Sequence, residues 1–276
     1  MRAIHLARKV TRRLQHLRAA RPIVEAIRRR GRGHGVQEVE DFDGDLRIAL
    51  DLSEHAANEI FWFGYRRHEV VRCLDRLLQP GDVVFDVGAR FGEITLVAAK
   101  RVGPAGAVFA FEALETTQRK LAANVAANGL GHVRRIPFAA ADHPGTRAVH
   151  AAAGRYLDRT LVAAAPALMA RVDLTTIDAV AAHYRLERLD GLRLDLEGAE
   201  LAALRGAAES LRRFRPWLLI ETARGPGTPA SDPRALVRAL TGYRLHRVEP
   251  DGRAQPLAPQ EPRPGQILLA TPVATA

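Results

Sequence analysis

The fold of this chain is decided at Val83-Val84-Phe85-Asp86-Val87-Gly88-Ala89-Arg90-Phe91-Gly92. An apolar run ends there in an acid, two glycines follow four residues apart, and a helical pattern begins at Glu93. A second apolar run, 107–111, ends in Glu112. Because short apolar runs are typical of buried parallel strands, the segment predicts a strand, a glycine turn, a helix and a second strand. Such a βαβ unit binds nucleotides.

The spacing of the glycines narrows the choice of ligand. A dinucleotide fingerprint has G-x-G-x-x-G and directs helix N–H groups at a pyrophosphate. Here the turn is D-x-G-x-x-x-G, with Asp86 ahead of the first glycine. A carboxylate there repels a phosphate and suits an ammonium group. The turn therefore favours S-adenosylmethionine, which has an ammonium, a sulfonium and a ribose but no phosphate. The alternative is a βαβ unit that binds nothing, or one that binds NAD with a degraded fingerprint.

Ligands of doubly wound sheets lie outside the carboxyl ends of the strands. We therefore expect Asp86 and Gly88 to hold the methionine end of the cofactor, and Glu112 to accept both ribose hydroxyls. Asp142 either accepts a hydrogen bond from the adenine amino group or only forms a turn, since His-Pro-Gly follows it. The predicted cofactor-binding residues are Asp86, Gly88, Ala89, Gly92, Glu112 and Asp142.

A later block strengthens this interpretation. It is Leu192-Arg193-Leu194-Asp195-Leu196-Glu197-Gly198-Ala199-Glu200-Leu201. With residues 81–89 and Phe111-Glu112, it resembles the FkbM family of S-adenosylmethionine-dependent methyltransferases, over about residues 60–225. Members show D-V-G-A-N-x-G, F-E-P and K-I-D-V-E-G-A-E-x-x-x-L-x-G-A. Arg90 stands where the family usually has Asn, and Ala113 where it has Pro. The guanidinium of Arg90 must point outward, or it would crowd the sulfonium.

Alternating strand and helix patterns predict an α/β fold, doubly wound around a mostly parallel sheet. The family resemblance implies that this sheet is the seven-stranded, Rossmann-like sheet of a class I methyltransferase. We expect a basic helical extension, 1–35, and a methyltransferase domain, 36–276, with the cofactor half at about 66–142. A hairpin is expected within 41–63, an irregular insert at 142–170, and an antiparallel last strand at 266–270. Further strands are expected at 83–87, 107–112, 133–138, 172–175, 191–196, 216–221 and 243–248.

Acidic residues near the strand at 191–196 are candidates for a catalytic role. Methyl transfer to a hydroxyl needs an aligned nucleophile that loses its proton. We expect Asp195 to act as base or to bind the acceptor hydroxyl, with Glu197 as its catalytic partner. Glu200, in a first helical turn, is interpreted as structural. Asp195, Glu197 and Glu221 offer the oxygen ligands that Mg²⁺ prefers, but without a second acidic cluster we assign no metal.

The resemblance implies O-methylation of a small molecule or a glycan. N-methylation is the alternative, although the strand at 191–196 lacks an N/D-P-P-Y/F motif. From another class, the chain could be an inactive cofactor-binding scaffold. The acceptor is not identified by the sequence, because its pocket would lie in the irregular regions 36–65 and 142–170.

Charge and composition limit the partners that can be expected. Residues 1–35 hold eleven Lys and Arg and one acid, and the net charge of the whole chain is +10. The rest of the chain is balanced, so no specific nucleic-acid surface is expected. The single cysteine, Cys73, excludes an internal disulfide and is compatible with a reducing cytosol. No run approaches a membrane span or a signal peptide, so we expect a cytoplasmic protein.

The extension has the pattern of an amphipathic helix. Its apolar face is expected to comprise Ile4, Ala7, Val10, Leu14 and Leu17. The opposite, basic side is expected to comprise Arg8, Lys9, Arg12 and Arg13. Such a helix either lies on an anionic membrane through residues 1–30, at the inner membrane surface, or packs on the domain or a neighbouring subunit of a homo-oligomer.

Overall fold

The computed structural model describes residues 2–14, 22, 26–27, 35–150, 169–222, 233–258, 263 and 265–273. The chain forms two compact units. The first comprises Met1–His68 and Ala126–Gly129, and the second comprises Glu69–Val125 and Leu130–Ala276. The domain boundary expected after residue 35 stays a prediction.

The first unit combines a helix, a hairpin and a second helix. Its elements are α1 (Arg2–Leu14), β1 (Val36–Phe42), β2 (Leu46–Asp51) and α3 (His55–Phe63). The expected hairpin is confirmed, because β1 and β2 pair antiparallel across the turn at Asp43 and Gly44. Its expected extent was wrong. The segment 55–63 is a helix, since Ala56, Ile60 and Phe61 recur at helical spacing and are buried.

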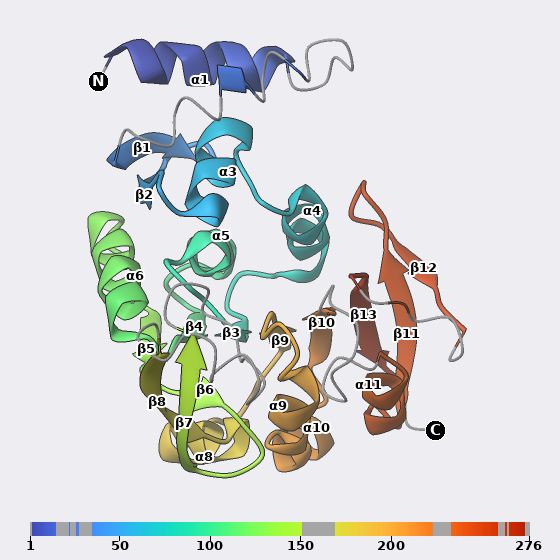
Figure 1. Ribbon diagram of the computed structural model, residues 1–276. Helices are drawn as coiled ribbons and strands as arrows, with labels where there is room; N and C mark the ends of the chain where they lie inside the picture. Colours follow the sequence, from blue (N-terminus) through green and yellow to red (C-terminus); the bar gives the residue numbers. More distant parts are fainter. Residues whose placement is uncertain are drawn as a thin grey trace. The chain divides into compact units, whose positions relative to one another are not determined.

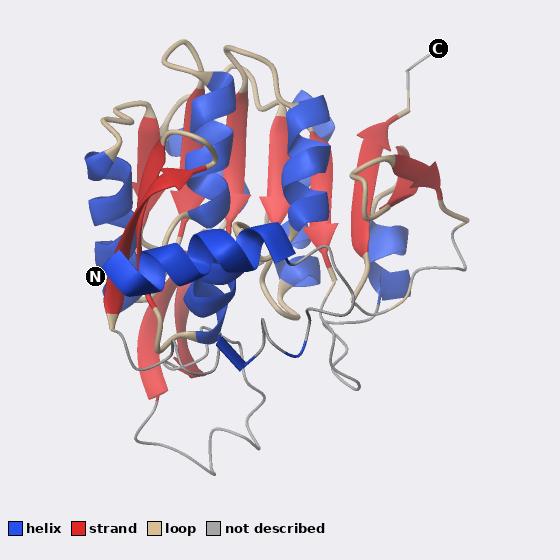
Figure 2. Ribbon diagram, turned by 90° about the horizontal axis from the view of Figure 1, so that it is seen from above, coloured by secondary structure: helices blue, strands red, loops and turns tan. Residues whose placement is uncertain are grey.

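The second unit is built on one large, mostly parallel sheet (Figures 1 and 2). Its strand order is β12-β11-β13-β10-β9-β3-β4-β5. Strands β10, β9, β3, β4 and β5 are mutually parallel, and β13 is antiparallel to β10 as expected. The sheet of the described residues has eight strands rather than seven, because the short β12 extends one edge. The strands are β3 (Val83–Val87), β4 (Ala107–Phe111), β5 (Val133–Ile136), β9 (Gly191–Leu194), β10 (Trp217–Glu221), β11 (Tyr243–Val248), β12 (Ala254–Pro256) and β13 (Ile267–Pro272).

Helices lie on both sides of this sheet, which makes the fold doubly wound. In Figure 1, α4 and α5 lie on one side of the strands, and α8, α9 and α10 on the other. The helical segment after β9 is divided at Gly206, where an added Cβ would come 2.0 Å from the carbonyl oxygen of Ala141. The helices are α4 (His68–Leu77), α5 (Glu93–Val102), α6 (Glu115–Ala127), α8 (Ile177–His183), α9 (Glu200–Arg205), α10 (Ala208–Phe214) and α11 (Pro233–Ala239).

Part of the insert expected to be irregular is a second, small sheet. It has the order β6-β8-β7, with β6 (Ala139–Ala140), β7 (Gly145–His150) and β8 (Met169–Thr175). Strands β7 and β8 pair antiparallel over six residue pairs. The positions 151–168 lie outside the described residues. The sequence missed this sheet because its strands pair across the intervening segment rather than through a short turn.

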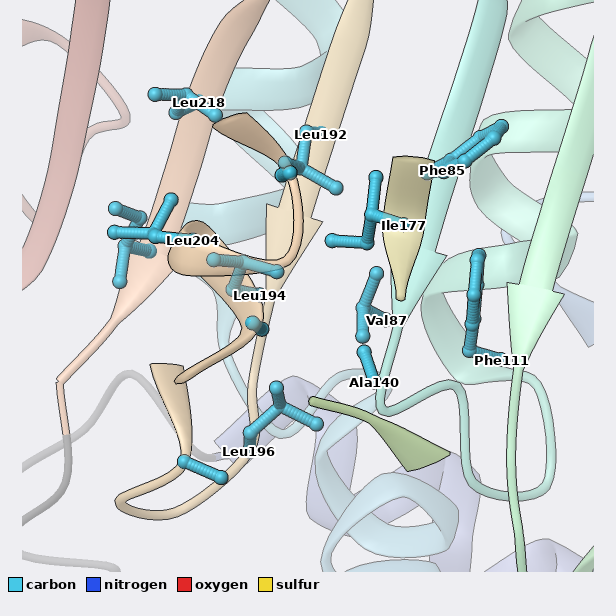
Figure 3. Packing of buried hydrophobic residues seen from close by; sticks show 14 of the residues in the cluster. Phe85, Val87, Phe111, Ala140, Ile177, Leu192, Leu194, Leu196, Leu204 and Leu218 are labelled. Atoms are coloured by element: carbon cyan, nitrogen blue, oxygen red, sulfur yellow. The ribbon is translucent and has the colours of Figure 1, made fainter. Parts of the chain in front are cut away.

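The core lies between the main sheet and its helices. Figure 3 shows Phe85, Val87, Leu192 and Leu194 packed with Ile177 in one buried cluster. Cys73 is buried, and burial raises the pKa of its thiol to about 11. Among the described residues, no helix is long and apolar enough to cross a membrane.

Candidate active site

A buried arginine joins the carboxyl ends of three neighbouring strands. Arg193, on β9, donates through Nη1 to Asp86 Oδ1 at 2.9 Å and through Nη2 to Asp195 Oδ2 at 2.8 Å. The same Nη2 also donates to Glu221 Oε1 at the end of β10. Only 5% of the Arg193 side chain is exposed. The guanidinium therefore organises three acids that lie far apart in the sequence.

This cluster, Arg193 with Asp86, Asp195 and Glu221, carries one positive and three negative groups. Burial lowers the pKa of Arg193, but Glu221, Asp195 and Asp86 together raise it well above its ordinary value. A buried guanidinium without partners would be strongly unfavourable, so the acids stabilise it. The acids outnumber it, which leaves an excess of negative charge where a cationic ligand would be favoured.

Sequence reasoning missed Arg193. The available signal was a single basic residue inside the otherwise apolar strand Gly191–Leu194, every residue of which is buried. An arginine is almost never buried in a strand unless acidic side chains pair with it. The guanidinium also contacts two of the three acids considered for Mg²⁺, Asp195 and Glu221. In the described part of the chain, no group of three or more metal-ligating side chains is suitably placed.

Asp86 is enclosed more completely than we expected. It is 1% exposed, and its second oxygen accepts a hydrogen bond from Thr95 Oγ1 at 2.6 Å. Both carboxylate oxygens thus have partners within the protein. Each oxygen has a second lone pair, but a carboxylate that is 1% exposed would reach the methionine ammonium only if neighbouring groups moved. Its predicted role stays a prediction, and its charge can act through Arg193 without such a contact.

The glycine turn is shaped by packing of the chain against itself. Gly88 has φ +89°, and a Cβ there would lie 2.2 Å from the carbonyl oxygen of Asp195. Gly92 has φ +102°, and its Cβ would lie 2.8 Å from Leu121 Cδ1. The N–H groups of Gly88 and Ala89 both donate to Phe111 O. Gly88 therefore allows the end of β3 to meet the end of β9, and Gly92 allows the turn to approach α6, which is a second reason for these glycines besides ligand approach.

Glu112 follows β4 and lies beside the turn. Its Oε2 accepts the Arg90 N–H at 3.1 Å, and its Oε1 accepts the Leu114 N–H at 2.9 Å. Burial raises the pKa of Glu112, against these hydrogen bonds and the charge of Arg90. Each carboxylate oxygen has a second lone pair, so the two oxygens can still accept ribose hydroxyls.

Arg90 and Glu197 meet across the ends of β3 and β9. Arg90 has φ +54° and Glu197 has φ +48°, a left-handed conformation that side chains other than Asn rarely adopt. The Arg90 Nη1 lies 3.9 Å from Glu197 Oε1, and both side chains are about one-third exposed. The guanidinium therefore turns toward an acid, which balances its charge near the cofactor turn.

Glu200 has the structural role that we expected. It is fully buried, and its Oε1 accepts the N–H groups of Leu196 at 3.2 Å and Gly198 at 3.0 Å. These bonds hold the turn that carries Glu197. Burial raises the pKa of Glu200 to about 7, with a smaller contribution from the nearby charge of Asp195.

Asp142 lies apart from these contacts. It is exposed in the turn before β7, and its Oδ1 lies 2.6 Å from Nδ1 of the adjacent His143. This arrangement agrees with a turn former, while the adenine contact stays a prediction. His183, the last residue of α8, is exposed.

Comparison with known proteins identifies the family. The family model described as Methyltransferase FkbM domain matches residues 86–245, which is more than half of the chain. The chain belongs to the FkbM methyltransferase family. The family is one of S-adenosylmethionine-dependent methyltransferases, and the matched range contains Asp86, Glu112, Arg193 and Glu221. No curated protein sequence matches the chain.

The solved structures similar to this chain include methyltransferases. The methyltransferase FkbM from Methylobacillus flagellatus KT is 16% identical, with a TM-score of 0.50, over 74% of this chain and 48% of that chain. The present chain thus spans about half the length of that FkbM-family member. An O-methyltransferase from Thermotoga maritima is 15% identical, with a TM-score of 0.45, over 86% and 92% of the two chains. Aeropyrum pernix fibrillarin with bound S-adenosyl-L-methionine is 16% identical, with a TM-score of 0.43, over 75% of each chain.

Proposed function

We propose that this FkbM-family chain transfers a methyl group from S-adenosylmethionine to a hydroxyl of a small molecule or a glycan. The observation that carries the proposal is the excess negative charge of the cluster of Arg193, Asp86, Asp195 and Glu221. It lies at the carboxyl ends of the strands, where ligands of such sheets bind. A cofactor with two positive groups and no phosphate fits this charge.

The residues available for the cofactor fit its chemistry. Glu112 would accept the ribose hydroxyls with its remaining lone pairs, and the turn Gly88–Gly92 would lie against the methionine end. Asp142 would approach the adenine amino group, and Asp86 would contribute charge. When bound, S-adenosylmethionine supplies an electrophilic methyl group.

Asp195 and Glu197 are proposed to serve the acceptor. The Asp195 carboxylate is held by Arg193 at 2.8 Å, so its orientation is set before any acceptor binds. Asp195 would receive the hydroxyl proton or orient the hydroxyl. Glu197, about one-third exposed, would contact the acceptor from the neighbouring turn.

The first experiment measures cofactor binding by calorimetry and then screens hydroxylated acceptors with methyl-labelled cofactor. The expected results are saturable binding and a methyl ether, identified by NMR of the product. A methylated amine would overturn the assignment to oxygen. Tight binding without transfer to any acceptor class would indicate the scaffold alternative.

A matched variant tests the catalytic assignment. Asp195→Asn keeps the shape and an acceptor for Arg193, so folding and cofactor affinity should change little. Turnover should fall by roughly 10²–10⁴, the usual scale for a lost general base. A large loss of cofactor affinity would instead place Asp195 in the cofactor site. Normal turnover would leave Asp195 with a structural role.

A further inference from the structure

Helix α1 is seated on the first unit by a different face from the one its sequence indicates. The buried residues are Ile4, Arg8 and Thr11, whereas we expected Arg8 on the solvent side. Arg8 Nε donates to Phe61 O at 2.8 Å, and Nη1 donates to Asp41 Oδ1 at 2.6 Å. The expected apolar face is therefore rotated, because a guanidinium with two good acceptors can be buried in place of a leucine or valine.

This rotation leaves apolar side chains in solvent. Leu6 is 65% exposed and Val10 is 45% exposed. Lys9, also exposed, lies on the same side, since positions 6, 9 and 10 are three and four residues apart on a helix. We call Leu6, Lys9 and Val10 the outer face of α1. Large apolar side chains placed beside a lysine on one exposed helix face are unusual unless something covers them.

The charge of the surrounding chain indicates what covers the outer face of α1. Residues 1–35 contain eleven Lys and Arg and only Glu25 as an acid, while the rest of the chain is balanced. A protein partner would have to be strongly acidic and apolar at one patch. An anionic bilayer offers both properties together, since its headgroups attract basic residues and its acyl boundary accepts leucine and valine.

We propose that the outer face of α1 docks on an anionic lipid surface, with α1 lying in the plane of the interface. The inward face stays on the protein through Arg8 and Ile4. The proposal concerns the first unit alone and does not depend on the proposed methyl transfer.

The test is co-sedimentation of the full-length protein with vesicles of phosphatidylglycerol and phosphatidylcholine, against phosphatidylcholine alone. We expect binding to the anionic vesicles only, weakening as salt screens the attraction. The double variant Leu6→Gln/Val10→Gln should lower the partition constant about tenfold or more, since it removes two inserting side chains without changing charge.

Val36→Gln is the matched control. Val36 is 61% exposed in the same unit but lies on β1, so this variant should bind vesicles like the unmodified protein. Circular dichroism and cofactor calorimetry of each variant show whether it is folded. Equal binding by the double variant, or equal binding to uncharged vesicles, would overturn the proposal. Loss of an oligomer in light scattering, without vesicle binding by the unmodified protein, would instead assign the face to a second copy.

Discussion

Buried acids are held in two ways around this site. Asp86, Asp195 and Glu221 are bonded to the guanidinium of Arg193, whereas Glu112 and Glu200 are bonded to backbone N–H groups. Burial raises the pKa of Glu112 and of Glu200, against the hydrogen bonds that they accept from backbone N–H groups. The first group thus shares one cation, while the second is held mainly by backbone amides.

The largest effect is expected from removing the cation. Arg193→Met leaves three buried carboxylates without their common partner, and should lower the free energy of unfolding by about 3–5 kcal/mol. Urea unfolding at pH 7 measures the loss. Arg193→Lys is the control, since it keeps the charge but not the planar fork that reaches three acids, and should lose less. Equal stability of Arg193→Met would show that the cluster does not depend on the guanidinium.

The raised pKa of Glu200 should make the free energy of unfolding depend on pH. The pKa of Glu200 is raised to about 7 in the folded protein, above its ordinary value of 4.5. The folded state thus holds a proton that the unfolded state has lost between these values. This contribution is fully present below pH 4.5 and is lost as pH rises through 7. It amounts to about 3 kcal/mol.

Glu200→Gln isolates this contribution. Glutamine cannot ionise but keeps an oxygen for the N–H groups of Leu196 and Gly198. The difference in unfolding free energy between the two proteins should therefore change between pH 4.5 and 7, in favour of the variant at the higher pH. A constant difference would contradict the raised pKa.

A smaller effect is expected from Glu112, measured as cofactor affinity. Glu112→Ala should weaken S-adenosylmethionine binding by roughly ten- to a hundredfold, the value of a lost charge-assisted hydrogen bond. Glu112→Gln keeps the size of the side chain and an acceptor for one of the two N–H groups, those of Arg90 and Leu114, so it removes the charge with less disturbance of the turn than Glu112→Ala. Calorimetry that finds unchanged affinity in both variants would remove Glu112 from the cofactor site.

The smallest effect should arise at the exposed ion pair of Arg90 and Glu197. Glu197→Gln leaves the guanidinium unbalanced, so S-adenosylmethionine should bind less well relative to S-adenosylhomocysteine, which lacks the sulfonium charge. Arg90→Asn should shift the ratio of the two affinities in the opposite direction. Each change should be about fivefold or less, since partly exposed pairs contribute up to about 1 kcal/mol. Shifts of the same sign would show that charge balance is not their role.

Local patterns were sufficient for much of the fold. The strand 83–87 was predicted with the bounds that the structure has, because it is a short apolar run that ends at a glycine turn. The antiparallel last strand was also predicted. The sheet of β6, β7 and β8 was not, since its pairing joins distant segments.

The acids of the site could be listed from the sequence, because each ends an apolar strand. Their partners could not. Arg193 was overlooked because a strand pattern does not reveal which acids surround a basic residue. The orientation of α1 was wrong for a similar reason, since Arg8 is buried only because Asp41 and the Phe61 carbonyl are in place.

The sequence by itself determined the alternation of strands and helices in the main sheet, the glycine turn after β3, the family, and the acids at the strand ends. These follow from apolar periodicity and from residues close together in the chain. Only the tertiary structure decided which acids share a cation, which are held by amides, and which face of α1 remains in solvent. Several of these pairings join residues distant in the chain, such as Arg8 with Asp41 and Asp86 with Arg193, where the separations are 33 and 107 residues. The local sequence determines each helix or strand, and long-range packing determines which charged groups surround it.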